Sequence, residues 1–297
     1  MNPKCQHCGR LGGRNSVYRR KSDRTKITQY RCFGCKRTWT EGTDTLEKRQ
    51  RLRSINQTLG PLLVSGVSMR RSAKLLGINR KTVARRISYL AAKSRLALAA
   101  SSSSNDSKGR GPRVHSQIYS QIYIDELITF EHTRCKPLAV CMAVSKERKI
   151  LAFSVSSMPP IGKHLKKISL RKYGPRPNHR KKGLVSCLER IREHTGPATV
   201  FVSDEEHSYR TQINRMYPGH AHQTHPSKRA VIAGQGELKD HSFDPLFAIN
   251  HTFAMLRANL ARLARRTWVT TKKASRLEEF IQIYAGFHNL ELTAQGS

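Results

Sequence analysis

Two cysteine pairs of the same spacing constrain this chain more than any other feature. They are Cys5-x-x-Cys8 and Cys32-x-x-Cys35, separated by 23 residues. Each Cys-x-x-Cys turn directs two sulfur atoms to one position, and two such turns supply the four thiolates that a tetrahedral zinc ion takes. The intervening residues suit a β-hairpin that is too small to bury a core without a metal. Structural disulfides or four independent thiols are the alternatives, and the duplicated spacing favours a zinc ribbon over residues 1–45.

The remaining cysteines and the histidine inside the first pair are not predicted to bind a metal. Cys135, Cys141 and Cys187 share no comparable spacing and are expected to be ordinary buried thiols. Four cysteines already complete a zinc shell, so His7 is expected to face solvent.

The charge balance of the chain indicates a polyanionic partner. Lysine and arginine number 55 against 20 aspartate and glutamate, a formal net charge of +35 over 297 residues. Binding of lysine and arginine to the phosphates of nucleic acid releases counterions, which favours the complex. A basic protein that binds membranes needs an apolar helical face or a lipid anchor as well. Residues 148–187 and 245–277 hold no acidic side chain, although a charge run alone is commonly a solvated surface. Together these observations predict a nucleic-acid-binding protein.

The sequence also predicts a cytoplasmic protein. No segment reaches the roughly 18 consecutive apolar residues of a transmembrane helix, and the first residues lack the apolar run of a signal peptide. Cysteines arranged as a metal site suit a reducing compartment better than secretion.

Residues 46–98 contain the pattern of a helix-turn-helix. Ser68 is a candidate N-cap for a first helix that would end just before the turn residue Gly77. Asn79 is a candidate N-cap for a second, basic helix, Arg80–Ala92, whose first side chains would reach base edges or phosphates. An αα-hairpin within a bundle is the alternative. The basic second helix favours a DNA-binding domain with contacts from Arg80, Lys81, Thr82, Arg85 and Arg86.

Residues 99–290 divide into a linker and a larger domain. Residues 99–114 are Ser-rich and then run Lys-Gly-Arg-Gly-Pro, which predicts a flexible linker. The domain over residues 115–290 orders its segments as three strands, a helix, a strand and further helices, typical of a ribonuclease-H-like α/β fold with a mixed sheet. The expected strands are 118–125, 136–144, 149–156 and 198–203, and the expected helices are 184–194, 209–216, 244–266 and 275–288.

Asp125 ends the first expected strand, and Asp204 stands at the end of the fourth. In an open α/β sheet, ligand sites lie at the carboxyl ends of strands, where neighbouring side chains converge. Two converging carboxylates repel each other unless a divalent cation is present, and oxygen ligands select Mg²⁺ or Mn²⁺. A lone aspartate at a strand end is more commonly a cap or turn residue. As a pair on this strand order, the two predict a metal site for attack at phosphorus.

Several segments of the chain carry motifs that occur together in one known family. They are the first cysteine pair followed by Tyr30–Trp39, the acidic motifs Ile124–Glu126 and Ser203–Tyr209, and the basic segment Leu256–Thr267 with Lys272. In these segments the chain resembles transposases of bacterial insertion sequences, specifically the type-one family, and the resemblance covers nearly the whole chain. It implies a DDE-type transposase that binds the terminal inverted repeats of its element through the ribbon and the helix-turn-helix. It also implies strand cleavage and strand transfer with Mg²⁺ or Mn²⁺, and Asp125 and Asp204 as ligands.

The chain departs from this family at the third acidic residue. The family places that residue on the long basic helix, seven positions before a Leu-Arg pair, which here falls at or beside Asn250. An asparagine offers one neutral carbonyl oxygen and no negative charge. Three interpretations therefore remain open: Asn250 substitutes with help from His251, Asp244 or Asp240 serves instead, or catalysis is lost. The first is favoured because the flanking helix matches the family closely.

Basic side chains on the expected helix 244–266 and just after it would lie against DNA, although half of such an amphipathic helix is explained by packing alone. The histidines at 207, 220, 222 and 225 have irregular spacing in a polar stretch and are expected to be solvated rather than a metal cluster. The basic candidates are Arg257, Arg262, Arg265, Arg266 and Lys272.

The expected protein is therefore a transposase acting on double-stranded DNA in the bacterial nucleoid, with structural zinc and catalytic Mg²⁺ or Mn²⁺. Two element ends must be joined, so a homodimer or a higher assembly on DNA is expected. One alternative is a transposase-derived DNA-binding protein that has lost catalysis at Asn250. The other is a zinc-ribbon transcription factor whose carboxyl-terminal domain is unrelated and does not bring Asp125 and Asp204 together.

Overall fold

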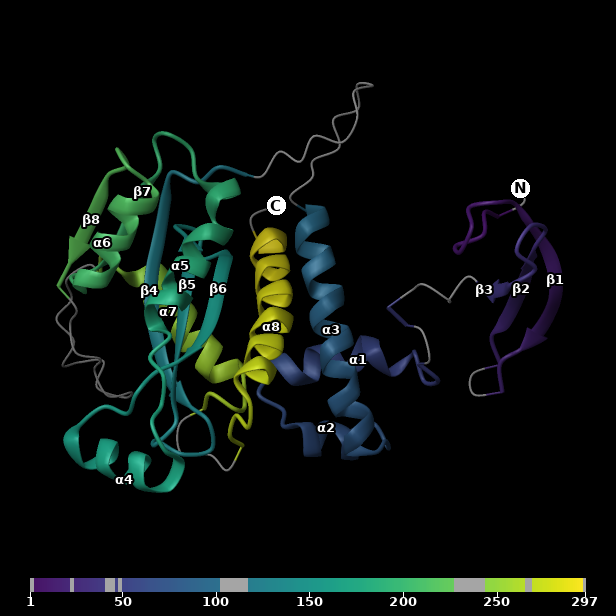
Figure 1. Cartoon of the computed structure of the whole chain (residues 1–297), viewed down its shortest axis with the longest axis horizontal. Helices are drawn as coiled ribbons and strands as arrows, with labels where there is room; N and C mark the ends of the chain where they lie inside the picture. The colour runs from purple at the N-terminus through teal and green to yellow at the C-terminus, as the bar shows by residue number, and fades with distance from the viewer. Residues whose placement is uncertain are drawn as a thin grey trace. The chain divides into compact units, whose positions relative to one another are not determined.

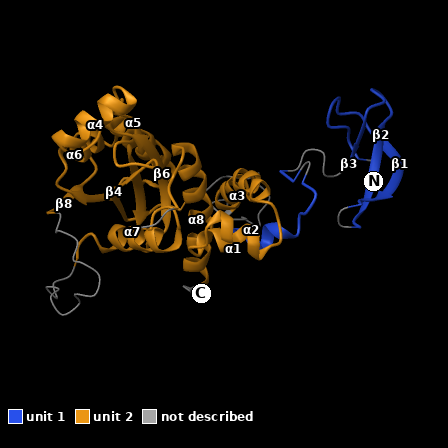
Figure 2. Cartoon of the chain, turned by 90° about the horizontal axis from the view of Figure 1, so that it is seen from below, with its two compact units in different colours: residues 1–60 blue, residues 61–297 orange. Residues whose placement is uncertain are grey.

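The chain forms two compact units, residues 1–60 and residues 61–297 (Figure 2). Each unit contains its own β-sheet (Figure 1). No helix in the described part of the chain is both long and apolar enough to cross a membrane. The computed structural model describes residues 3–21, 24–40, 46–47, 50–101, 117–226, 244–264 and 269–295.

The first unit holds a three-stranded antiparallel sheet made of β1 (Gly12–Arg19), β2 (Lys26–Cys32) and β3 (Thr38–Thr40). The predicted hairpin between the cysteine pairs is thus confirmed as β1 and β2, and β3 adds a strand that was not expected. Trp39 on β3 is buried against Cys5 and Cys32. Because this cluster is small, the sheet has little apolar core of its own.

The second unit is organised around a five-stranded mixed sheet. Its strand order is β6-β5-β4-β7-β8, with β4, β5 and β6 antiparallel and β7 and β8 parallel to β4. All nine residues of β5 are buried, as expected of a strand covered on both faces. The strands are β4 (Gln121–Phe130), β5 (Pro137–Ser145), β6 (Ile150–Ser157), β7 (Val200–Asp204) and β8 (His222–His225).

Helices cover both faces of this sheet. Figure 2 shows α5 (Arg180–Arg190) and α6 (His207–Met216) on one side and α7 (Phe247–Asn259) on the other. On the α5 side, Ile122 and Ile124 of β4 pack with Leu184 and Leu188 of α5 in a buried cluster. On the other side, α7 contacts β4 and β5. The sheet is therefore the middle layer of a three-layer α/β arrangement.

Both helices expected for the helix-turn-helix segment are present, and they belong to the same compact unit as the large sheet. Helix α1 (Ile55–Val64) spans the boundary between the units, and α2 (Met69–Leu75) and α3 (Arg80–Ser101) follow it. Helix α3 packs along α8 (Ala274–Gln295), as Figure 1 shows. The sequence-based division into separate domains at 46–98 and 115–290 therefore differs from the compact units of the structure.

Polar contacts fix α3 against α8. The Ser94 hydroxyl donates to the carbonyl oxygen of Gln282 at 2.6 Å, and Arg276 donates to the Ser88 hydroxyl at 2.8 Å. A Cβ at Gly286 would collide with the Ser94 side chain, so the glycine allows the two helices to approach closely. These contacts explain why α3 continues to Ser101, beyond the expected end at Ala92. Residues 99–101 of the expected linker are helical, and residues 102–114 lie outside the described residues.

The long basic helix expected over 244–266 is shorter in the structure. Helix α7 begins at Phe247 and ends at Asn259, because Leu260 has an extended backbone with φ −104° and ψ 104°. The Asn259 carbonyl oxygen accepts a hydrogen bond from the backbone N–H of Gly66 at 2.7 Å. A turn after α1 therefore satisfies a carbonyl that would otherwise be unpaired at this helix end.

Two elements of the second unit were not expected from the sequence. Helix α4 (Lys163–Tyr173) lies in the basic stretch that was interpreted only as a charge run. Strand β8 consists of four polar residues, His222–His225, and it forms by backbone pairing with β7. Strand β8 has no apolar residue, and in α4 the few apolar residues are outnumbered by lysine and arginine, so the segment was interpreted by its charge.

Candidate functional site

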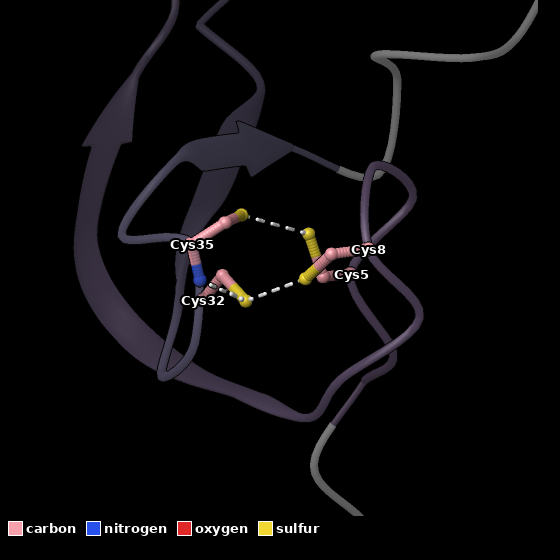
Figure 3. A group of neighbouring side chains, drawn as sticks. All are labelled: Cys5, Cys8, Cys32 and Cys35. Atoms are coloured by element: carbon pink, nitrogen blue, oxygen red, sulfur yellow. Dashed lines mark hydrogen bonds between the residues drawn. The ribbon is translucent and has the colours of Figure 1, made fainter.

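The four paired cysteines lie together in the first unit, as predicted. Their Sγ atoms all lie within 4.8 Å of one another, and Figure 3 shows them facing a common centre. The shortest separations are 3.4 Å between Cys8 and Cys32 and 3.7 Å between Cys5 and Cys35. Four sulfurs around a zinc ion are separated by about 3.8 Å, given a zinc–sulfur distance of about 2.3 Å. The cluster therefore has the donor set and the spacing that a structural zinc ion requires.

Backbone groups of the two knuckles support thiolates in this cluster. The N–H of His7 donates to Cys5 Sγ and the N–H of Cys35 donates to Cys32 Sγ, both at 3.4 Å. Desolvation raises the pKa of the Cys32 thiol, but the hydrogen bonds that it accepts outweigh this and lower that pKa to about 6. A backbone hydrogen bond lowers the pKa of the Cys35 thiol, but desolvation and the neighbouring cysteines outweigh it and raise that pKa to about 11, so without a metal the four thiols do not all ionise together. His7 is exposed, as expected. The free cysteines Cys135, Cys141 and Cys187 are buried, which was also expected.

Asp125 and Asp204 occupy neighbouring parallel strands of the large sheet. Ile124 of β4 pairs with Ser203 of β7, so the two aspartates follow at adjacent positions. Strand β7 ends at Asp204 as expected, but β4 continues to Phe130 and Asp125 lies within it. The sheet thus brings together the two carboxylates that the sequence singled out.

The environment of Asp125 disfavours its charge. Desolvation raises the pKa of the Asp125 carboxyl to about 6, and the nearby charge of Asp204 acts in the same direction. Hydrogen bonds oppose this effect: the N–H of Glu126 donates to Asp125 Oδ1 at 2.6 Å and the Tyr209 hydroxyl donates to the same oxygen at 3.4 Å. A buried carboxylate beside a second carboxylate is the electrostatic situation that a divalent cation relieves.

A second acidic group lies on the opposite face of β4. Successive strand residues alternate between faces, so Glu126 shares its face with Ile124 and faces α5. Its side chain is 5% exposed, and Arg180 at the start of α5 donates to Glu126 Oε2 at 2.7 Å. The same guanidinium lies 3.9 Å from Glu206, the N-cap residue of α6. Desolvation raises the pKa of Glu126, and Arg180 opposes that rise.

Sequence reasoning missed this Glu126–Arg180–Glu206 network. The only available signal was the doublet Asp125-Glu126, because alternation in a strand must direct one of two consecutive acids away from the other. Arg180 could not be singled out, since it is one of nine basic residues between Lys163 and Lys182.

The structure pairs two of the candidates for the third ligand with each other. Asn250 Nδ2 donates to Asp244 Oδ2 at 3.0 Å, and both residues are exposed. Asp244 Oδ1 also accepts a hydrogen bond at 2.9 Å from the backbone N–H of Leu246, the residue just before α7. His251 faces Arg148 instead, with 3.3 Å between its Nδ1 and Arg148 Nη1. Asp240 lies outside the described residues.

A third carboxylate does not join the Asp125–Asp204 pair among the described residues. The four cysteines are the only group there of three or more His, Cys, Asp or Glu side chains placed to share a metal ion. The histidines at 207, 220, 222 and 225 do not belong to that group. His222 is nevertheless not simply solvated, because its Nε2 lies 2.9 Å from the hydroxyl of Ser203.

The start of α3 presents most of the expected DNA-contacting side chains. The side chain of Asn79 caps the helix by accepting from the N–H of Lys81 at 2.8 Å, as predicted. Arg80, Lys81 and Arg85 are exposed and Thr82 is partly exposed. Arg86 differs, because it is only 7% exposed and so lies within the packing of the unit. Its guanidinium is not presented for a phosphate contact.

The basic residues near the carboxyl end separate into two groups. The Arg262 guanidinium lies 3.6 Å from the ring centroid of Phe280, so this side chain packs on α8 and does not form part of a free basic face. Desolvation, with the neighbouring Arg276, lowers the pKa of Arg262 to about 10. Lys272 is exposed and Arg257 is partly exposed. Arg265 and Arg266 lie outside the described residues.

The candidate site thus has two parts, a thiolate cluster in the first unit and a carboxylate pair in the sheet of the second. Comparison with known proteins adds no relative to it. No protein-family model matches the chain, and no match was found among curated proteins.

Proposed function

We propose that this protein is a DDE-type DNA transposase that binds the terminal inverted repeats of an insertion sequence and performs strand cleavage and strand transfer. The single observation that carries the proposal is the pair Asp125 and Asp204, at adjacent positions of the neighbouring parallel strands β4 and β7. The strand order of the sheet supports a ribonuclease-H-like domain, with three antiparallel strands followed by two strands parallel to the first.

The residues of the pair fit a Mg²⁺ or Mn²⁺ ion. Their oxygens are the ligands that these ions prefer, and the raised pKa of Asp125 reflects a burial that a bound cation would offset. When bound, the ion would neutralise charge at the attacked phosphate and favour ionisation of the attacking hydroxyl. Asn250 is the third ligand in this proposal, whereas Asp244, to which it is hydrogen-bonded at 3.0 Å, does not join the two aspartates in this structure.

The chain's own residues hold and orient the DNA in this proposal. Exposed cations at the start of α3 would contact the element end, and the thiolate cluster would hold the zinc that folds the ribbon.

Water attacks phosphorus at the element end, the bond to the 3′-oxygen breaks, and that oxygen takes a proton. The new 3′-hydroxyl then attacks a phosphorus of the target DNA, the bond from that phosphorus to a target 3′-oxygen breaks, and the displaced oxygen takes up a proton in place of the one that the attacking hydroxyl releases. Joining two ends requires at least a dimer on DNA.

Strand-transfer assays on the inverted repeats that flank the gene test this proposal. We expect Asp125→Asn and Asp204→Asn to lower the rate by about 100-fold or more, with end binding retained, because each removes a charged metal ligand. Glu205→Gln is the matched control, since Glu205 is the exposed carboxylate next to Asp204. Equal activity of Asp204→Asn and the unmodified protein would contradict the proposal.

A second candidate function is DNA binding by a transposase-derived protein without catalysis. It is favoured by one observation: among the described residues, no third carboxylate accompanies Asp125 and Asp204. In that case the unmodified protein and Asp204→Asn would bind the element ends equally and neither would cleave them at any Mg²⁺ or Mn²⁺ concentration. Recovery of cleavage by Asn250→Glu would then identify the missing charge as the cause.

A further inference from the structure

A cavity in the first unit borders the thiolate cluster at Cys32 and differs from it in the chemistry of its other lining residues. Its volume is about 300 Å³, and it opens between β1 and the knuckle that follows β2. None of the residues that line it is acidic. They are Gly13, Arg14, Asn15, Arg31, Cys32, Phe33 and Lys36.

Phe33 is the feature of this cavity that folding does not explain. Its side chain is 59% exposed, whereas the apolar cluster of the ribbon is formed by Trp39 with Cys5 and Cys32. The ring lies over Gly13, where an added Cβ would come within 2.8 Å of Phe33 Cζ. Because Gly13 has no side chain, the Phe33 ring can lie directly against the sheet, and the other face of the ring is exposed.

Three cations surround the exposed ring. Arg14, Arg31 and Lys36 all line the cavity and are all exposed. Arg31 lies directly across the β1–β2 ladder from Gly13, so it flanks the position that the ring covers. An aromatic face bordered by cations, without a carboxylate, matches a nucleotide, whose base stacks on the ring while its phosphate meets the cations.

We infer that this cavity binds an unpaired nucleotide of single-stranded DNA, with its base stacked on Phe33 and its phosphate held by Arg14, Arg31 and Lys36. Single-stranded DNA is the partner because a base within a duplex is covered on both faces by its neighbours and cannot offer a face to Phe33. The inference rests on the proposed function only in taking DNA as the polyanion. It deepens that proposal by adding strand ends or overhangs to the duplex repeats as ligands.

Binding of a short single-stranded oligonucleotide by the zinc-loaded full-length chain tests the inference. We expect Phe33→Ala to weaken this binding about 5- to 150-fold, the equivalent of losing one base–aromatic stack. Tyr18→Ala is the matched control, because Tyr18 is 48% exposed on β1 but does not line the cavity. It should change affinity by less than about twofold. Phe33→Trp should restore binding, since tryptophan also offers a stacking face.

A second readout separates stacking from general charge attraction. A 2-aminopurine base in the oligonucleotide should lose fluorescence on binding to the unmodified protein and to Phe33→Trp, but not to Phe33→Ala. Duplex binding should be unchanged by Phe33→Ala. Equal effects of Phe33→Ala and Tyr18→Ala, or equal weakening of single strands and duplex by Phe33→Ala, would overturn the inference. Asp204→Asn should bind the oligonucleotide normally, so a failure of the catalytic proposal is distinguished from a failure of this one.

Discussion

At the scale of single residues, Asp125 is a candidate site residue whose ionisation lowers the stability of the folded protein. Its side chain is partly buried in the sheet, beside Asp204, and its pKa is raised to about 6 by desolvation and by that neighbouring charge. An unfolded chain ionises aspartate near pH 4, so the folded state binds more protons between about pH 4 and pH 6. Stability is therefore lost as pH rises through this interval, and the loss persists at pH 7.

Asp125→Asn should consequently stabilise the protein when Mg²⁺ and Mn²⁺ are absent. We expect its free energy of unfolding to rise by about 1 to 3 kcal/mol at pH 7 and to be unchanged below about pH 4, where the native carboxyl is already protonated. Urea denaturation at both pH values measures this, with zinc retained and Glu205→Gln as the control. A gain of equal size at both pH values would show that relief of a buried charge is not the cause.

When Mn²⁺ is added, Asp125→Asn should become less stable than the unmodified protein. A ligand that binds only the folded state stabilises it by about 2.7 kcal/mol at 100 times its dissociation constant. The unmodified protein should gain this stability, and Asp125→Asn should gain much less. Denaturation repeated over a range of Mn²⁺ concentrations checks the expectation, and an equal gain in both proteins would place the metal elsewhere.

At the scale of elements, Arg180 joins three of them by its contacts with Glu126 on β4 and with Glu206 at the start of α6. Arg180→Gln leaves the buried Glu126 carboxylate without its cation, which raises the pKa of Glu126 further. We expect the free energy of unfolding to fall by about 1 to 3 kcal/mol at pH 7, after allowance for the partial exposure of Arg180. The loss should shrink at pH 4, where Glu126 accepts a proton.

Denaturation of four proteins separates this effect from general damage: the unmodified chain, Arg180→Gln, Glu126→Gln and the double variant. Coupling between the two positions should be evident, because Arg180→Gln has little to remove once Glu126 is neutral. Lys181→Gln is the control, since Lys181 is an exposed neighbour in the same basic stretch. Additive effects of the two substitutions would contradict a direct ion pair.

Helix α4 offers a separate prediction about DNA affinity. Five of its eleven residues are lysine or arginine, and all five are exposed. Neutralising Lys167 and Arg171 should lower the slope of log affinity against log salt concentration by up to about 0.9 for each phosphate that is no longer neutralised, without changing stability. Lys146→Gln with Arg192→Gln, two exposed cations away from α4, is the matched control. Salt titration of duplex binding measures both pairs, and equal slopes would exclude α4 from the DNA interface.

The elements that could be predicted from the sequence are those with a strong local pattern. Continuous apolar runs located β5, β6 and β7, and caps at Ser68 and Asn79 located α2 and α3. Strand β8 was not predicted because its four residues are polar and its position depends on pairing with β7, which its own sequence does not record. The early end of α7 depends on a contact with Gly66, nearly 200 residues away, which no local pattern records.

The candidate site residues divide in the same way, into those that a sequence pattern predicts and those whose environment depends on distant contacts. The Asp125–Asp204 pair could be found because neighbouring parallel strands bring equivalent positions side by side, although Asp125 lies within β4 and not at its end as expected. The cysteines could be found because their spacing repeats. The burial of Arg86 and the stacking of Arg262 on Phe280 could not, because both depend on packing between distant helices. Basic side chains on amphipathic helices look alike in a sequence whether they face solvent or a neighbouring ring.

At the scale of the whole molecule, the two units differ in what holds them together. Residues 61–297 contain a five-stranded sheet with helices on both faces, whereas the ribbon in residues 1–60 has an apolar cluster of only a few side chains around Trp39. A formal net charge of +35 adds self-repulsion, which a small unit resists poorly. Zinc should thus matter greatly to the first unit and little to the second.

Removal of zinc should therefore unfold the ribbon alone. After strong chelation, we expect limited proteolysis to cut within residues 3–40 while the large sheet stays protected, because binding of the metal supplies the folding free energy of a unit this small. Cys8→Ser should reproduce the pattern without chelator, since it removes one of the four thiolates, and chelator should then add little. Zinc analysis and mass spectrometry of the fragments measure the outcome. Survival of an intact ribbon without zinc would show that its apolar cluster suffices, and cutting throughout the sheet would show that the metal stabilises both units.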